Sequence, residues 1–285
     1  MTTQVSKAIL ITGCSTGIGR ATAERLARAG HKVYASARRI EAIQDLAAAG
    51  CQLLALDVCD ETSMTAAVQN IERGEGAVGV LINNAGYGSE GPFEEVPMTE
   101  VRRQFETNVF GLIRLSQLVL PGMRRQRWGK IVNLSSMGGR LTLPGGAFYH
   151  ATKYAVEALS DALRFEVRGF GIDVIVIEPG AIKTEFGATA VAKVDALGSG
   201  DSPYAGFRDS LKQQIRNAYE GPMAMLAADA DAVAKVIEKA ITASRPSSRY
   251  LITFGARFLV GLRRWLPDRA FDAFLRTQFA APGQR

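Results

Sequence analysis

Short apolar runs alternate with longer mixed runs along most of the chain. Seven of the apolar runs are five or six residues long and rich in Val, Ile and Leu, which is typical of buried strands. They cover Lys7–Thr12, Lys32–Ala37, Gln52–Leu56, Val78–Ile82, Lys130–Leu134, Asp173–Ile177 and Arg249–Thr253. Between them, apolar residues recur at helical spacing. This alternation predicts a doubly wound α/β fold, in which a seven-stranded parallel sheet carries helices on both faces.

The chain is long enough for one such domain. Its 285 residues show no internal repeat and no low-complexity linker. We expect the domain to cover residues 1–254, followed by an extension over residues 255–285. The first predicted strand begins within a few residues of Met1, so we expect no signal peptide. No apolar run reaches the roughly 20 residues that span a bilayer. The three cysteines lack metal-binding spacing, so we expect no metal and a cytoplasmic location with reduced thiols.

A glycine-rich turn follows the first predicted strand and leads into a helix. Such a turn offers backbone N–H groups and the positive end of a helix to a phosphate, and glycine permits the close approach. A simple tight turn is the alternative. The order of strand, turn and helix favours a dinucleotide site. Its members are Gly13, Ser15, Thr16, Gly17, Ile18 and Gly19.

Tyr149 and Lys153 are four residues apart in an apolar helical run. Residues at this spacing lie on one face of a helix, so both polar groups can reach one point. The pKa of a free tyrosine is about 10, and a nearby ammonium group is expected to lower it. The pair is then a candidate acid–base catalyst. An ordinary half-buried tyrosine followed by a surface lysine is the alternative.

Seven motifs occur together in one order. They are TGCSTGIG (Thr12–Gly19), LDV (Leu56–Val58), NNAG (Asn83–Gly86), NVFG with Asn108, the pair Ser135–Ser136, YHATK (Tyr149–Lys153) and Pro179–Gly180 with Thr184. From about residue 6 to 252 the chain resembles the short-chain dehydrogenases/reductases, and the wording of its motifs is nearest to hydroxysteroid and retinol dehydrogenases. The resemblance implies a single Rossmann-type domain. It also implies an oxidoreductase that interconverts a carbonyl and an alcohol by hydride transfer.

By resemblance, four residues form the catalytic group. Tyr149 is the acid/base, and Lys153 lowers its pKa and holds the nicotinamide ribose. Ser136 orients the substrate, with Ser135 as the competing assignment. Asn108 holds a water in the proton relay, or alternatively fills a helix kink.

The same resemblance assigns the cofactor contacts. Asp57 accepts a hydrogen bond from the adenine amino group, and Val58 packs beside it. Further contacts are expected from Asn84, Ala85, Gly86, Tyr149, Lys153, Pro179, Gly180, Ile182 and Thr184. Ala37 occupies the acidic slot of NAD-preferring members, and Arg38 and Arg39 follow it. A guanidinium group suits a 2′-phosphate, so NADP(H) is favoured. NAD(H) is the alternative, because Thr16 stands where many NADP(H) members carry a basic residue and because the two arginines can be a solvated helix entry.

Residues 185–221 form a long insertion that resembles the family's substrate lid, with a predicted helix over Phe207–Tyr219. Its apolar beginning favours a lipophilic substrate, and the resemblance to hydroxysteroid and retinol dehydrogenases implies one of steroid, retinoid or fatty type. The expected substrate contacts are Ser136, Met137, Leu143, Tyr149 and Phe186, with Leu141, Phe148 and Met223 as further candidates. For any single apolar position, an ordinary core role is the alternative.

The extension over residues 255–285 carries most of the net charge. Six arginines against two aspartates give it +4 of the whole chain's +6. Aromatic residues at helical spacing predict one or two amphipathic helices broken at Pro267. The extension can pack on the domain, cap the cavity, or contact a partner subunit or a membrane surface. Nothing else in the chain indicates nucleic-acid binding.

Two function classes remain open. One is the NADP(H)-dependent oxidoreductase, and the other is a non-catalytic dinucleotide-binding redox sensor or scaffold. Family members usually pair through the helices that correspond here to Val101–Leu120 and Tyr154–Arg168. We therefore expect a homodimer or homotetramer.

Overall fold

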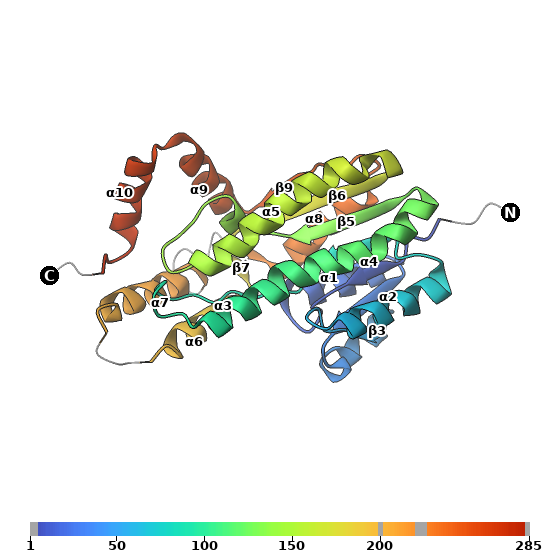
Figure 1. Ribbon diagram of the computed structural model, residues 1–285, viewed down its shortest axis with the longest axis horizontal. Coiled ribbons are helices and arrows are strands. Elements are labelled where there is room, and N and C mark those ends of the chain that lie inside the picture. Colours follow the sequence, from blue (N-terminus) through green and yellow to red (C-terminus); the bar gives the residue numbers. More distant parts are fainter. Residues whose placement is uncertain (1–4, 199–201, 220–226, 283–285) are drawn as a thin grey trace.

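The central feature of the molecule is a parallel sheet of seven strands in the order β3-β2-β1-β4-β5-β6-β9. The computed structural model describes residues 5–198, 202–219 and 227–282 (Figure 1). The predicted doubly wound sheet is confirmed, with strand ends within two residues of those expected. The strands are β1 (Ile9–Ile11), β2 (Val33–Ala37), β3 (Gln52–Ala55), β4 (Val80–Asn83), β5 (Gly129–Leu134), β6 (Ile172–Pro179) and β9 (Arg249–Ile252).

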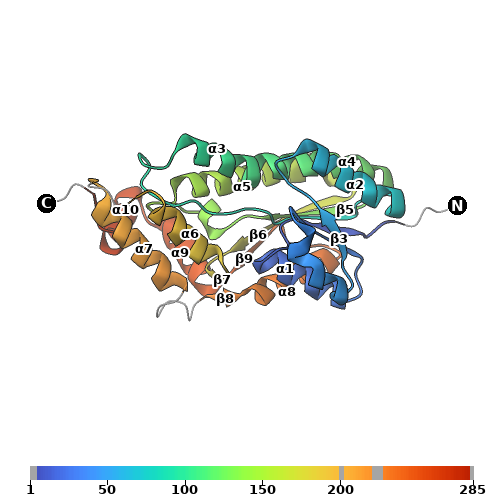
Figure 2. The same cartoon turned by 90° about the horizontal axis from the view of Figure 1, so that it is seen from below.

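Helices cover both faces of this sheet. Figure 2 shows α1 (Gly17–Arg28) and α8 (Ala230–Thr242) on one side. On the other side lie α2 (Glu61–Glu75), α4 (Gly111–Gln126) and α5 (Ala147–Val167). Because both faces are covered, the strands are apolar along their whole length rather than at alternate positions.

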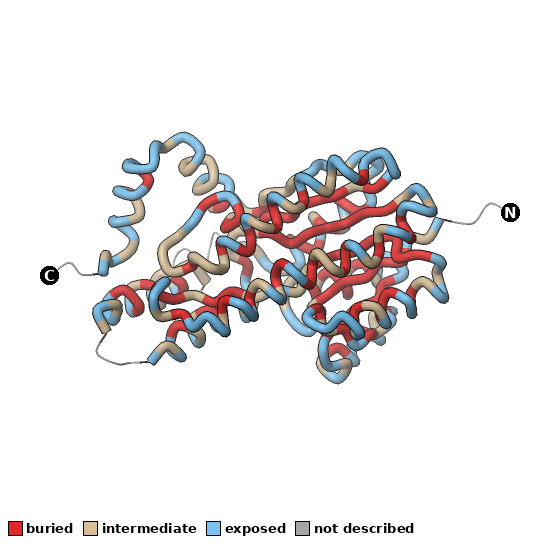
Figure 3. The backbone as a smooth tube through the Cα atoms, viewed as in Figure 1, coloured by how far each residue is buried: buried red, intermediate tan, exposed pale blue. Residues whose placement is uncertain are grey.

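Successive residues of β1 enter two separate cores. Ile9 and Ile11 pack in the core beneath α1 and α8, whereas Leu10 packs in the core beneath α2 and α4. All three side chains are buried. The period of two along a strand therefore divides the apolar residues between two layers, which is why Figure 3 shows the sheet as the most buried part of the molecule.

The chain changes direction at β1, which has β2 on one side and β4 on the other. In open α/β sheets, ligands bind outside the carboxyl ends of the strands at such a switch point. Several short segments surround this edge. They are η1 (Ile40–Ala49), α3 (Met98–Phe105), η2 (Glu106–Phe110) and η3 (Met137–Gly139). A further short segment, η4 (Arg168–Phe170), precedes β6 and lies at the opposite edge.

The insertion after β6 begins with a short parallel pair, β7 (Ile182–Lys183) and β8 (Ala228–Asp229). Two helices lie between them in the chain, α6 (Phe186–Asp195) and α7 (Ala205–Tyr219). Helix α7 confirms the prediction over Phe207–Tyr219, and α6 was not predicted. The two helices pack through a small apolar cluster of their own that includes Ala190.

The C-terminal extension forms two helices, α9 (Phe254–Trp265) and α10 (Asp268–Gln278), which confirms the predicted break at Pro267. In Figure 1 they arch away from the sheet on the side where the lid helices lie. Most of their surface is exposed in Figure 3. Among the described residues, no helix combines the length and apolar character needed to cross a membrane.

Candidate active site

One large cavity, of about 930 Å³, opens at the carboxyl ends of the strands. Its wall contains nearly every predicted cofactor and substrate residue, drawn from the loops that follow β1 to β6. The predicted residues on the wall are Gly13, Ser15, Thr16, Gly17, Ile18, Arg38, Asp57, Val58, Asn84, Ala85, Gly86, Ser136, Met137, Leu143, Tyr149, Lys153, Pro179, Gly180, Ile182, Thr184 and Phe186. Gly19, Arg39 and Asn108 do not reach the wall.

The glycine turn is shaped as a cradle for a phosphate. Gly13 has φ of 73°, and a Cβ atom there would lie 2.9 Å from the Cα of Ala85. A Cβ on Gly19 would collide with the carbonyl oxygen of Gly13. Gly19 therefore serves the packing of the turn rather than contact with a ligand. Helix α1 has no side-chain cap and no acidic residue in its first turn, so its positive end is available to an anion.

Asparagine side chains hold this turn against the neighbouring strands. The amide of Asn84 donates to the carbonyl oxygens of Thr12, at 2.8 Å, and Gly13, at 3.1 Å. Asn83 donates to Asn133 on β5 at 2.9 Å. The NNAG motif therefore joins neighbouring strands, and it brings Asn84 to the cavity wall at the same time.

Most of the residues expected near the adenosine part of the dinucleotide line the cavity. Ala37 is the buried last residue of β2, and Arg38 is exposed on the cavity wall. Arg39 is exposed, does not line the cavity, and stands directly before η1. One oxygen of Asp57 accepts the N–H of Cys59 at 2.9 Å. That bond fixes the carboxylate and leaves its second oxygen for a ligand donor.

Tyr149 and Lys153 lie on the cavity side of α5, one turn apart. Lys153 Nζ donates to the carbonyl oxygen of Leu134 at 2.8 Å and lies 5.7 Å from the centre of the Tyr149 ring. Burial lowers the pKa of Lys153 to about 8, while the nearby carboxylate of Glu157 acts to raise it. The ammonium group is thus held between the end of β5 and the tyrosine ring.

The pKa of Tyr149 is the clearest departure from expectation. Burial raises it to about 12, a hydrogen bond with Ser136 lowers it, and the charge of Glu90 raises it. We expected Lys153 to bring it below 10, and that expectation is wrong for this arrangement. Desolvation disfavours the phenolate more than its neighbours favour it. The phenol therefore keeps its proton at neutral pH, as a proton donor must.

Ser136 is the serine that meets Tyr149, which favours it over Ser135 as the substrate-orienting hydroxyl. Its Oγ accepts the N–H of Gly138 at 3.0 Å and so caps the short helix η3. His150, which was not predicted, holds the same loop. Its Nδ1 hydrogen bonds the carbonyl oxygen of Gly138 at 2.9 Å, and its Nε2 accepts the N–H of Leu143 at 3.2 Å. Both ring nitrogens are used, which indicates a neutral imidazole with a positioning role.

Asn108 lies just behind the cavity, within the π-helical turn η2. Its amide donates to the carbonyl oxygen of Tyr87 at 2.9 Å and to Thr152 Oγ1 at 3.1 Å, and its oxygen accepts the N–H of Tyr87 at 3.1 Å. A Cβ on Gly86 would lie 3.1 Å from Asn108 Oδ1 and 3.8 Å from Lys153 Nζ. Asn108 thus stabilises a distorted helix, and both its side chain and that of Lys153 approach Gly86.

The substrate end of the cavity is largely apolar. Phe186, at the start of α6, lies 5.4 Å from the Tyr149 ring, and Met137 and Leu143 line the same region. Two further candidates are corrected. Leu141 is fully buried away from the cavity, and Phe148 instead packs on Phe93 with ring centres 4.8 Å apart. Met223 and Gly221 fall outside the described residues.

Several lining residues were missed by sequence reasoning. Glu90 lines the cavity from the loop after β4, Tyr219 comes from the end of α7, and Phe279 follows α10. Phe279 lies far along the chain from the strands of the sheet. The helical spacing of aromatic residues in the extension was the one sequence signal that could have placed it near the cavity. Nothing in the local sequence distinguishes Glu90 from the surface carboxylates that follow it.

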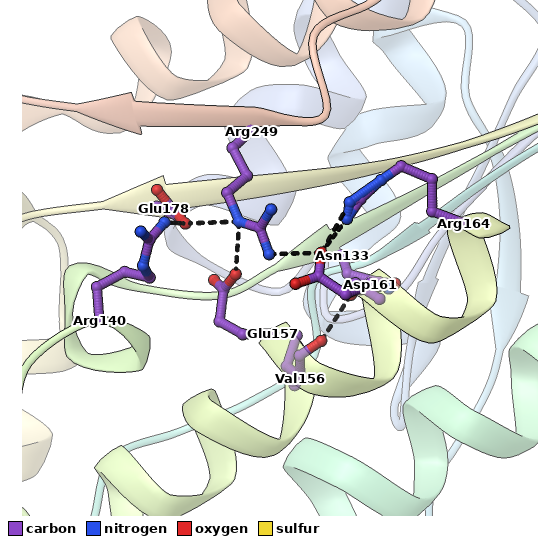
Figure 4. Close-up of polar contacts among 9 residues, drawn as sticks. Asn133, Arg140, Val156, Glu157, Asp161, Arg164, Glu178 and Arg249 are labelled. Carbon is purple, nitrogen blue, oxygen red and sulfur yellow. Dashed lines mark hydrogen bonds and ion pairs between the residues drawn. The ribbon is translucent and has the colours of Figure 1, made fainter.

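Helix α5 is fixed to the sheet by a network of ion pairs (Figure 4). Arg249 on β9 reaches Glu157 on α5 at 3.0 Å and Glu178 on β6 at 3.4 Å. Arg140 pairs with the same Glu178 at 3.0 Å. The Glu178 side chain is only 1% exposed, so its two arginines compensate a buried charge. The network thereby sets the position of the helix that carries Tyr149 and Lys153.

Known proteins resemble this chain along nearly its whole length. A family model described as short chain dehydrogenase matches residues 7–195. The 3-ketodihydrosphingosine reductase of Bacteroides thetaiotaomicron is 37% identical, over 95% of this chain and 97% of that protein. The NADPH-dependent 3-dehydrocapnine reductase of Ornithobacterium rhinotracheale is 32% identical, over 92% and 94%. Retinol dehydrogenase 8 of Bos taurus is 34% identical, over 85% and 80%.

Solved structures share the fold. A short-chain dehydrogenase from Streptomyces avermitilis superposes with a TM-score of 0.78 at 32% identity, covering 96% of each chain. A serine dehydrogenase complexed with NADP+ has a TM-score of 0.74 at 25% identity, covering 86% of this chain and 94% of that one. A xylitol dehydrogenase bound to NAD+ has a TM-score of 0.74 at 26% identity, covering 88% and 99%. The structural relatives thus use either nicotinamide dinucleotide.

Proposed function

The chain belongs to the short-chain dehydrogenase family, and we propose that it is an NADP(H)-dependent oxidoreductase that interconverts a carbonyl and an alcohol on a lipophilic substrate. The observation that carries this proposal is that Ser136, Tyr149 and Lys153 line the same cavity as the glycine turn. A proton donor, an orienting hydroxyl and a phosphate cradle then share one space.

Each catalytic residue has a proton or a hydrogen bond to supply. The dinucleotide, when bound, supplies or accepts the hydride. In the reducing direction, the Tyr149 phenol donates its proton to the carbonyl oxygen, and Ser136 donates a hydrogen bond to the same oxygen as negative charge develops. Lys153 holds a ribose hydroxyl and replenishes the tyrosine proton. Asn108 supports this lysine from behind Gly86 and orders the water from which the proton comes.

The preference for NADP(H) rests on the end of β2. Ala37 presents no carboxylate to repel a 2′-phosphate, and the Arg38 guanidinium lies on the cavity wall where it can pair with one. A serine dehydrogenase of this fold binds NADP+, which is consistent with the preference.

The lipophilic substrate rests on the lining of the cavity. Met137, Leu143 and Phe186 surround the approach to Tyr149, and burying apolar substrate surface against them is favourable. The names of the sphingosine-type and retinol-type relatives are compatible with a substrate of this kind.

The first test is reduced-nicotinamide consumption on a panel of steroid, retinoid, fatty and small aromatic carbonyls, with NADPH and NADH compared. We expect turnover with NADPH on the bulky lipophilic compounds and its loss in Tyr149→Phe. A redox sensor or scaffold would instead bind NADPH tightly, turn over no compound, and behave alike with and without the tyrosine hydroxyl. Intact Ser136, Tyr149 and Lys153 in one cavity favour the enzyme.

Two partner contacts complete the proposal. The chain pairs with further copies of itself through α4 and α5. Tyr154 and Phe165 are exposed on α5, and Phe110 is exposed at the end of η2, directly before α4. The helices α9 and α10 contact the surface of an anionic membrane, since their arginines flank exposed aromatic side chains. A membrane contact at this place suits a lipophilic substrate, because Phe279 leads from the extension to the cavity.

A further inference from the structure

Glu90 places a carboxyl group in the apolar end of the cavity. The loop that carries it runs from β4 to α3, and the side chain lines the same space as Tyr149 and Tyr219. The charge of Glu90 acts on the pKa of both tyrosines, which places the carboxyl near the phenol proposed to donate the proton. Glu90 takes no part in the mechanism proposed above.

The Glu90 carboxyl has no protein partner. Within residues 5–198, 202–219 and 227–282, no hydrogen bond or ion pair reaches it. Three of the cations on the cavity wall are engaged elsewhere: Lys153 with the Leu134 carbonyl, Lys193 with Glu100 at 2.8 Å, and Arg103 over the Tyr87 ring. The fourth, Arg38, directly follows β2 in the part of the wall proposed for the adenosine end. Outside the described residues, the segments 1–4, 199–201 and 220–226 contain no lysine, arginine or histidine, and Arg285 is the one such residue. Among the described residues, the Glu90 carboxyl is therefore an acidic group of intermediate exposure with no cation paired to it.

The loop holds this carboxyl in a defined place. The N–H of Gly91 donates to the carbonyl oxygen of Gly145 at 2.8 Å. The backbone at Gly88 lies against the Phe186 ring, since a Cβ there would be 2.5 Å from Phe186 Cζ. Phe186 in turn packs on Tyr149. Glu90 is thus fixed between two residues that are tied to the reacting end of the cavity.

A lone carboxylate in an apolar space is costly unless a cation meets it. Burial raises the pKa of Glu90 to about 7, so protonated and charged forms are both populated near neutral pH. A bound cation would favour the charged form and remove the penalty. Because the space is otherwise built for the substrate, the cation most consistent with it belongs to the substrate itself.

We propose that Glu90 binds a primary ammonium group on the substrate, so that the enzyme acts on lipophilic carbonyls or alcohols bearing an amino group a few carbons from the reacting carbon. This inference rests on the proposed function for the reaction, but the ammonium site can be tested without it. Glu90 is a binding and specificity residue, and the proton transfer stays with Tyr149.

Binding provides the first test. Titration calorimetry near neutral pH compares n-octylamine with 1-octanol on the wild-type chain, Glu90→Gln and Glu185→Gln. Glu185 also lines the cavity, so its variant removes a different carboxylate from the same wall. We expect Glu90→Gln to weaken the amine by about tenfold to a hundredfold relative to the alcohol. Glu185→Gln keeps the preference. Equal weakening by both variants, or no preference in the wild type, overturns the inference.

Kinetics provide the second test and separate the two proposals. The substrates are a long-chain α-amino ketone and the same ketone without the amine, and the readout is the ratio of their kcat/KM values. A wild-type ratio well above one that collapses in Glu90→Gln and is kept in part by Glu90→Asp supports the inference. Turnover of both ketones at a ratio near one overturns it and leaves the proposed function standing. Turnover of neither ketone, with amine binding that depends on Glu90, overturns the proposed reaction and supports the ammonium site.

Discussion

At the scale of single residues, the chemistry depends on a tyrosine that holds its proton. With the pKa of Tyr149 raised to about 12, the neutral phenol dominates at every ordinary pH, and only the small tyrosinate fraction can act as a base. Reduction and oxidation should therefore respond to pH in opposite ways, because one consumes the phenol and the other needs the tyrosinate.

We predict that kcat/KM for alcohol oxidation rises from about pH 6 to about pH 8, because the tyrosinate fraction grows about tenfold per pH unit below the pKa of Tyr149 while Lys153, whose pKa is about 8, keeps its positive charge. Carbonyl reduction should show no such rise. Tyr149→Phe should lose about 10²–10⁴-fold in both directions while it still binds NADPH. Initial rates in both directions, with cofactor binding followed by fluorescence, test this. A plateau in oxidation below about pH 8 would contradict it.

A second prediction concerns Arg38. Arg38→Ala removes the guanidinium from the cavity wall beside Ala37, so KM for NADPH should rise by about tenfold to a hundredfold. KM for NADH should change little, since it lacks the 2′-phosphate. Arg39→Ala is the matched control, because Arg39 follows in the chain but lies outside the cavity. Equal effects on both cofactors would mean that Arg38 serves the fold rather than the choice of cofactor.

At the scale of elements, one arginine connects the edge strand of the sheet to helix α5. Arg249 is the cation nearest to Glu157 in the network of Figure 4, and Glu178 also depends on it in part. Removing one partner of a buried ion pair leaves an uncompensated charge, which costs far more than the pair contributes.

We predict that Arg249→Met lowers the free energy of unfolding by about 2–3 kcal/mol, somewhat less than for a fully buried pair because Arg140 still compensates Glu178. The control is Arg164→Met, which also removes a cation from Asp161 but at the exposed side of α5. That change should cost less than about 1 kcal/mol. Urea denaturation of the three proteins measures both. Similar losses in the two variants would show that the buried carboxylates are protonated or otherwise compensated.

The C-terminal helices carry a prediction of their own. Phe254, Phe258 and Trp265 are 74%, 59% and 83% exposed, and their spacing places them on one face of α9. We predict binding to vesicles rich in phosphatidylglycerol, weaker binding to phosphatidylcholine, and a decrease at high salt. Replacing the three aromatics by alanine should reduce the bound fraction about tenfold in a sedimentation assay. Phe165→Ala, an exposed aromatic on α5, is the control. Vesicle binding that changes with neither the lipid charge nor the substitutions would contradict a membrane contact through α9.

At the scale of the whole molecule, the outer faces of α4 and α5 are the surface through which we expect self-association. Phe165 on α5 is 87% exposed, and Phe110 beside α4 is 51% exposed. Light scattering after size exclusion should give the mass of a dimer or tetramer for the wild-type chain. Phe165→Glu should shift that mass toward the monomer, because a carboxylate in an apolar interface is costly. A monomeric wild-type chain at micromolar concentration would rule out this assembly.

How much the sequence predicts depends on how local each interaction is. The seven strands could be predicted because each is a continuous apolar run, and the order of the motifs located the cavity at their ends. Helix α6 was missed because its alanines read equally well as a loop. The raised pKa of Tyr149 and the isolated carboxyl of Glu90 could not be predicted. Both depend on which segments close over them, and that is set by contacts between residues far apart in the chain.

The position of Phe279 makes the C-terminus a poorer place than the N-terminus to attach a tag. It lines the cavity although it follows the last helix, and only six residues come after it. Figure 1 shows the described chain ending beside the lid, at the opposite end of the molecule from its beginning. An affinity tag or fluorescent fusion at the C-terminus would therefore be anchored at the substrate entrance and would alter the kinetics that it was meant to help measure. The same addition at the N-terminus keeps its distance from the entrance.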